Sequence, residues 1–170
     1  SLVMTEEERK TTAYHEAGHA AAHLHYGHDV LRVTIDGDEE AAGHTYTYGL
    51  MMYEPQYRKT LAREHIIVCY AGGEAQRRIT PSIELWQVED DEAQAFDLLR
   101  ECPPRRYSYV GDDVYWARLE RLRTEARRLV ARLWPQIECI AAALLERNTL
   151  TGNELRAVCE LVDRTGGTGV

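Results

Sequence analysis

The segment His15-Glu16-Ala17-Gly18-His19 constrains this chain more than any other part of its sequence. An α-helix has about 3.6 residues per turn, so His15 and His19 would lie about one turn apart on one face, where both imidazoles can reach a single Zn²⁺ ion. Glu16 would lie at the edge of that face, where its carboxylate can act on a metal-bound water without occupying the metal. The pattern predicts a zinc hydrolase site with His15 and His19 as metal ligands and Glu16 as the catalytic base.

The residues around this segment favour a helix. Thr5-Glu6-Glu7-Glu8 has the form of a capping box, which starts a helix, and Gly27 can end it. Small apolar residues on the face away from the histidines would let the helix pack closely against a core: Ala13, Ala17, Ala20, Ala21 and Leu24. This setting favours a metal site over the alternative of two solvated histidines on an amphipathic helix.

Two histidines leave a third zinc ligand to be found, and two nearby histidines are poor candidates. His23 is eight residues from His15, about 12 Å along the helix axis, which is too far for both to hold one ion. We interpret His23 as a solvated histidine or as a partner of a ligand. His25 could join the two ligands on one ion only if a glycine at position 22 turned the chain back toward them. Ala22 stands there and continues the helix instead.

Two acidic segments are the other candidates for the third ligand. Glu39 and Glu40 lie in a sequence typical of a turn rather than of a ligand-bearing helix. The run Glu89-Asp90-Asp91-Glu92 could supply a ligand, but negative side chains also favour the first turn of a helix because of the helix dipole. From the residues alone, both interpretations of this run stay open.

Five segments together follow the pattern of a known family. They are Thr12 to Ala20, Arg32 to Ile35, Cys69 to Ala75, Asp90 to Ala95, and Leu144 to Leu155. The chain resembles the peptidase domain of FtsH-type zinc metalloproteases, which are membrane-bound, ATP-dependent proteases. The resemblance implies that Asp91 is the third zinc ligand. It also implies that Ala95 is small enough to let its helix approach the His15 helix.

The chain departs from that family in ways that bear on function. Arg77-Arg78 stands where the family has a Glu-Glu pair, which removes an alternative carboxylate and favours Asp91. No Gly-x-x-x-x-Gly-Lys-Ser/Thr loop is present, so we expect no ATPase module in this chain. The longest apolar run, Ile66 to Ala71, is far shorter than a bilayer requires. We therefore expect either a fragment of a longer protease or a standalone relative, without membrane contact of its own.

Composition and charge narrow the class of protein. With 170 residues, 44% of them apolar, the chain can bury one core, and we expect a single domain over residues 1–164 and a disordered tail over 165–170. A net charge of −8 disfavours binding to nucleic acid, and the arginines between residues 118 and 132 are interpreted as a solvated helix face. The spacing of the four cysteines favours a reducing compartment. We expect a cytoplasmic protein, on the cytosolic face of a membrane if it was cut from a longer FtsH-type protein.

Hydrophobic periodicity predicts a mainly α fold with a small β-hairpin or sheet (α+β), and the resemblance makes it an FtsH-like zincin domain. His65 would lie on an apolar stripe, where a hydrogen-bonded core histidine is favoured over a metal ligand. Pro135 would end or kink a long helix, and Thr151-Gly152-Asn153-Glu154 would cap the last one. The predicted elements are the strands 30–35 and 44–50, a first helix that starts at the Thr5 capping box and ends near Gly27, and helices that contain residues 57–78, 93–100, 113–134 and 135–147.

These observations predict a zinc-dependent metalloendopeptidase that hydrolyses unfolded or extended polypeptides through a metal-activated water. The strand from Arg32 to Ile35 would pair with the substrate backbone. Two alternatives stay open: a non-catalytic scaffold or adaptor domain, and a zinc amidase that acts on small substrates. A homo-oligomer or a separate ATPase partner is compatible with the resemblance.

Overall fold

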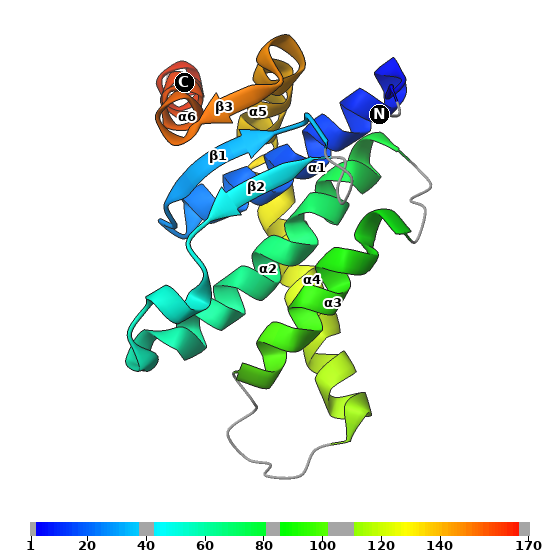
Figure 1. The fold of residues 1–170 in the computed structure, drawn as a ribbon, viewed down its shortest axis with the longest axis vertical. Coiled ribbons are helices and arrows are strands. Elements are labelled where there is room, and N and C mark those ends of the chain that lie inside the picture. Colours follow the sequence, from blue (N-terminus) through cyan, green and yellow to red (C-terminus); the bar gives the residue numbers. More distant parts are fainter. Residues whose placement is uncertain (1–2, 38–42, 81–85, 102–110, 167–170) are drawn as a thin grey trace.

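The computed structural model describes residues 3–37, 43–80, 86–101 and 111–166, which form a helical domain with a small antiparallel sheet (Figure 1). This agrees with the fold class predicted from the sequence. The helices are α1 (Glu6–His25), the short 3-10 helix η1 (Leu50–Met52), α2 (Pro55–Ile79), α3 (Trp86–Glu101), α4 (Asp112–Arg132), α5 (Trp134–Arg147) and α6 (Gly152–Gly166). The strands are β1 (Val30–Thr34), β2 (His44–Thr47) and β3 (Thr149–Thr151).

The sheet has the order β2-β1-β3, with both pairings antiparallel. The predicted strand and its hairpin partner are confirmed, with shorter bounds, and β3 joins them from the distant turn between α5 and α6. Because β1 has a partner strand on each side, its backbone groups are already paired. The prediction that residues 32–35 pair with a substrate backbone is therefore wrong. The strand at one edge of the sheet, next to β1, is β2.

Helices α1 and α2 pack against each other at very short range. A Cβ on Gly18 would lie 2.5 Å from the backbone oxygen of Ala71 and 2.8 Å from Cβ of Ala75, so only glycine fits at this position. The capping box predicted at the start of α1 is present: the Thr5 hydroxyl accepts from the Glu8 amide, and the Glu8 carboxylate accepts from the Thr5 amide. The capping box thus fixes the start of α1, and Gly18 lets this helix lie directly against α2.

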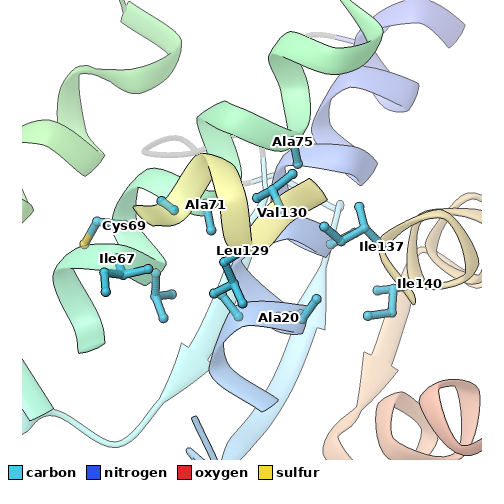
Figure 2. Close-up of a cluster of buried hydrophobic side chains, with 14 of the residues drawn as sticks. Ala20, Ile67, Cys69, Ala71, Ala75, Leu129, Val130, Ile137 and Ile140 are labelled. Carbon is cyan, nitrogen blue, oxygen red and sulfur yellow. The ribbon is translucent and has the colours of Figure 1, made fainter. Parts of the chain in front are cut away.

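The main core forms where α4 and α5 pack on this helix pair (Figure 2). Each fully buried leucine or isoleucine contributes about 1.5–3 kcal/mol relative to an exposed one, so this cluster fixes the four helices relative to one another. Buried side chains shown there come from all four helices: Ala20, Ile67, Ala71, Ala75, Leu129, Val130, Ile137 and Ile140.

A buried carboxylate joins α2 to α4. Glu74 is 5% exposed, and its two oxygens accept from Arg123 Nε at 3.0 Å and from Arg127 Nε at 3.2 Å. The sequence predicts a solvated face for the arginines of this helix. The structure corrects that interpretation for Arg123, which is 26% exposed, whereas Arg127 also contacts Glu74 but stays 58% exposed.

The starts of α5 and α6 agree with the predictions from the local sequence. Helix α4 ends at Arg132, and α5 starts at Trp134 with Pro135 in its first turn, as the proline predicts. At the start of α6, the Thr151 amide donates to Glu154 and the Glu154 amide donates to the Thr151 hydroxyl, which is the predicted capping box.

Two predictions of organisation differ in their outcome. Helix α6 continues to Gly166, so the predicted disordered tail is wrong for residues 165 and 166, and residues 167–170 lie outside the described part of the chain. The single domain over residues 1–164 stays a prediction. Within the described residues, none of the helices combines the length and the apolar character needed to cross a bilayer.

Candidate metal centre

The two histidines of the motif face each other on α1. His15 Nε2 and His19 Nε2 lie 3.0 Å apart. The other ring nitrogen of each has an oxygen partner: His15 Nδ1 donates to Gln76 Oε1 at 2.9 Å, and His19 Nδ1 donates to the Val68 carbonyl at 2.8 Å. In the neutral rings, both Nε2 lone pairs therefore point into one small space, which favours a cation between them.

Asp91 enters the same space from α3. Its Oδ2 lies 2.9 Å from His15 Nε2 and 3.3 Å from His19 Nε2, and it makes no hydrogen bond of good geometry within the described residues. Burial by itself would raise the pKa of Asp91, but the two imidazoles, His19 foremost, hold it well below its usual value. Burial likewise would lower the pKa of His19, but the Asp91 carboxylate outweighs it and raises that pKa to about 9. The site is thus built to hold positive charge.

Two adjacent glycines of α2 make room for this cluster. A Cβ on Gly72 would stand well inside van der Waals contact with His19 Nε2 and 2.9 Å from His15 Nε2. A Cβ on Gly73 would lie 3.0 Å from Val88 Cγ1 of α3. Gly72 therefore admits the imidazoles of α1, and Gly73 admits the helix that carries Asp91. The expectation that Ala95 brings α3 onto α1 needs correction, because α3 packs mainly against α2 and α4.

The three groups fit a zinc ion. Tetrahedral Zn²⁺ with ligand bonds of about 2.0–2.1 Å holds its ligand atoms about 3.3 Å apart. The three separations here are 2.9, 3.0 and 3.3 Å. Two neutral imidazoles and one carboxylate form a donor set that Zn²⁺ prefers in catalytic sites, and the buried Asp91 oxygen lacks another partner among the described residues. The metal role of His15, His19 and Asp91 stays a prediction that this geometry supports.

Glu16 lies beside the cluster and outside it. The residue is 6% exposed, and its Oε2 accepts from the Thr45 hydroxyl at 2.7 Å. Thr45 belongs to the edge strand β2, so the sheet fixes the direction of this carboxylate. Sequence reasoning missed Thr45, since the approach of β2 to α1 is a tertiary contact without a local signal.

None of the other candidates for the third ligand that the structure describes lies in the centre. In the acidic run, Glu89, Asp90 and Glu92 are exposed, and only Asp91 turns inward. His25 is exposed at the end of α1. Glu39 and Glu40 lie outside the described residues.

Of the two interpretations given for His23, a solvated histidine or a partner of a ligand, the structure contradicts the first. His23 is 6% exposed and lies near His28 and His65, in a second group whose ligand atoms come within 4.8 Å of one another. Sequence reasoning did not single out His28. The signal was Gly27, whose positive φ of 72° ends α1 and folds the next residue back over the last turn.

The cysteines within the described residues form neither a disulfide nor part of a metal-ligand cluster. Cys69, Cys139 and Cys159 are free thiols, and Cys102 lies outside the described residues. Burial raises the pKa of the Cys69 thiol far above its usual value, so this side chain behaves as part of the core.

Comparison with known proteins places the chain in a family. A sequence profile of peptidase family M41 matches residues 2–103. The ATP-dependent zinc metalloprotease FtsH of Thermus thermophilus is 30% identical over 94% of this chain and 30% of its own length. The FtsH of Acidobacterium capsulatum is 26% identical over 99% of this chain and 32% of its own length. FtsH 2 of Alkaliphilus metalliredigens is 40% identical over 53% of this chain and 13% of its own length.

The chain therefore spans less than a third of the length of these relatives. The profile match covers the segment that carries His15, Glu16, His19 and Asp91. The relatives are named as zinc metalloproteases, which agrees with the donor set found at the centre. This chain belongs to peptidase family M41.

Proposed function

We propose that this chain is a zinc-dependent metalloendopeptidase that cleaves unfolded or extended polypeptides. The observation that carries the proposal is the convergence of His15 Nε2, His19 Nε2 and Asp91 Oδ2, with the buried carboxylate of Glu16 beside them. A metal of purely structural use would have no need of a buried carboxylate next to it. Membership of peptidase family M41 supports the same chemistry.

The ligands would be His15, His19 and Asp91. A bound Zn²⁺ would lower the pKa of a water molecule and polarise the peptide carbonyl of the substrate. Gln76 and the Val68 carbonyl hold the two imidazoles in the tautomer that leaves Nε2 free. Gly72 keeps the space between α1 and α2 open for the ligand atoms.

Glu16 would move the protons of the reaction. Its carboxylate accepts a proton from the attacking water and then delivers it to the departing amine of the cleaved peptide bond. The hydrogen bond from Thr45 holds one carboxylate oxygen, Oε2, in place and leaves Oε1 for the proton. Such positioned acid–base catalysis contributes about 10²- to 10⁴-fold to the rate.

An extended substrate would pair with β2. This strand is at the edge of the sheet, and its residue Thr45 touches Glu16, so a polypeptide added beside β2 would pass the catalytic group. Backbone hydrogen bonds to an edge strand give affinity with little dependence on side chains. That mode of binding suits unfolded polypeptides of varied sequence.

The relatives' names include ATP dependence, and this chain matches only part of their length. We propose that a separate ATPase module or partner, or assembly into a homo-oligomer, delivers unfolded polypeptide to the site. We further propose that the peptidase works in the cytoplasm, on the cytosolic face of a membrane if the chain is part of a longer protein.

The test compares Glu16→Gln with the parent chain on unfolded casein and on a fluorogenic peptide. We expect the variant to keep its zinc and to lose peptide cleavage by about 10²- to 10⁴-fold, because an amide cannot accept the proton. Glu7→Gln is the matched control, since Glu7 is exposed on the first turn of the same helix. A variant that digests casein as fast as the parent would show that the domain has another base; an inactive parent that holds zinc would favour a scaffold.

A further inference from the structure

A second group of histidines forms where α1 ends. The His28 amide donates to the His23 carbonyl at 2.9 Å, and the Gly27 amide donates to the Leu24 carbonyl at 3.0 Å. These two bonds are the Schellman motif, which stacks the residue after the glycine over the residue five positions earlier. An apolar pair usually meets there. In this chain, His23 and His28 meet instead, with their Nδ1 atoms 2.9 Å apart.

His65 of α2 completes the group. Its ring stacks on His28 with centroids 4.6 Å apart and meets His23 edge-on at 5.4 Å. His65 Nε2 is buried and has no hydrogen-bond partner in the described part of the chain, contrary to the prediction of a hydrogen-bonded core histidine. One nitrogen from each of the three rings lies within 4.8 Å of the other two.

The second group repeats the features of the first. Each has two histidine nitrogens in contact, at 2.9 Å here and 3.0 Å between His15 and His19. Each also has a buried ligand atom without a hydrogen-bond partner among the described residues, His65 Nε2 here and Asp91 Oδ2 there. Buried polar atoms without partners are rare in folded proteins, and an absent ion is one recognised reason for them.

The protonation of the rings also suits metal binding. His28 Nε2 donates to Glu64 Oε2 at 2.7 Å, an arrangement that orients a ligating imidazole and leaves Nδ1 for the metal. Burial lowers the pKa of His23 to about 2 and that of His65 to about 4, so both rings are neutral at neutral pH. Neutral imidazoles offer the lone pairs that a metal needs.

We propose that His23, His28 and His65 form a second, structural metal site for a divalent transition metal such as Zn²⁺, separate from the centre at His15 and His19. Imidazole ligands favour zinc, copper or nickel over calcium or magnesium. Small ring rotations would bring the three nitrogens to the separation of about 3.3 Å that a tetrahedral ion requires, with water in the fourth position. The ion would fasten the end of α1 to α2, one helical turn beyond His19.

The experiment counts zinc per chain by elemental analysis after dialysis against a zinc buffer. We expect two equivalents in the parent and one in His65→Phe, which keeps an aromatic ring against His28 but has no ligand atom. His25→Phe is the matched control, since His25 is an exposed histidine of the same helix end, and it should keep two. A His65→Phe chain that binds as much zinc as the parent overturns the proposal.

A second measurement does not depend on the folding of that variant. His15→Asn disables the first centre and retains all three histidines of the second. We expect the ring nitrogen resonances of His23, His28 and His65 to shift on addition of one equivalent of zinc, and the melting temperature to rise. If these resonances do not respond, the cluster is a hydrogen-bonded packing unit and the second site does not exist.

Discussion

Gly72 lies so close to His19 that no side chain fits between them, and a Cβ on residue 72 would overlap the ring nitrogen that faces Asp91. The same atom would lie 2.9 Å from His15 Nε2. The absence of a side chain at this position of α2 is therefore what allows α1 to present both imidazoles to α3. The centre depends on three helices, although only α1 carries the recognisable motif.

Gly72→Ala should weaken zinc binding. The added methyl group must push the imidazoles off the positions where they meet Asp91, and disturbing the orientation of metal ligands typically costs about 10- to 100-fold in affinity. Competition with a fluorescent chelator measures the effect. Gly49→Ala is the control, because a Cβ there meets nothing within 4 Å. Equal zinc affinity in the two variants would mean that α2 yields easily and does not shape the site.

Thr45→Val should slow peptide cleavage without loss of zinc. Valine has nearly the shape of threonine but cannot donate to Glu16 Oε2, so the carboxylate loses its fixed direction. A hydrogen bond to a charged group is worth about 1.5–3 kcal/mol, and a loss of about 1.4 kcal/mol in the transition state lowers kcat tenfold. Steady-state kinetics on a fluorogenic peptide measure kcat and KM separately.

The control for Thr45→Val is Thr47→Val, two positions along β2 on the same face of the strand. We expect Thr47→Val to keep the parent kcat. A parent-like kcat in Thr45→Val would show that Glu16 needs no support from the sheet, and the proposed role of Thr45 would have to be abandoned.

Glu74→Ala should destabilise the fold. Glu74 is 5% exposed and pairs with Arg123, which is 26% exposed, and with Arg127, which is 58% exposed. Removing the carboxylate leaves Arg123 partly buried without this partner, and we expect a cost of about 2 kcal/mol after allowing for solvent screening. Urea unfolding followed by circular dichroism measures the free energy of unfolding.

Glu125→Ala is the matched control for Glu74→Ala. It removes the ion pair with Arg63, in which both side chains are more than 40% exposed. Such a surface pair contributes about 0–1 kcal/mol. If the two variants lose the same free energy of unfolding, the buried position of Glu74 has no special part in joining α2 to α4.

Local chemistry made much of this fold predictable. Thr5 and Thr151 each start a helix through a capping box, and Pro135 separates α4 from α5, because these signals act within a few residues. The position of His15 and His19 on one face of α1 could be predicted from the helical period alone. Asp91, by contrast, could not be separated from an ordinary helix start by its own sequence, and a family resemblance was required to single it out.

The features that sequence reasoning missed are contacts between distant segments. Thr45 reaches Glu16 only because β2 pairs with β1, and the pairing of β1 with β3 on its other side was not foreseen. The solvated interpretation of His23 is wrong because His65 of α2 packs against its ring. Nothing near His23 in the sequence indicates that His65 will cover it.

The most direct test of the central claim is the zinc content of Asp91→Ala against that of Asp90→Ala. The two carboxylates are neighbours, but only Asp91 points toward His15 and His19, whereas Asp90 is exposed. We predict that Asp91→Ala retains one zinc equivalent fewer per chain than Asp90→Ala after dialysis, whatever the second site contributes. Equal zinc content in the two variants would contradict the assignment of Asp91 as the third ligand.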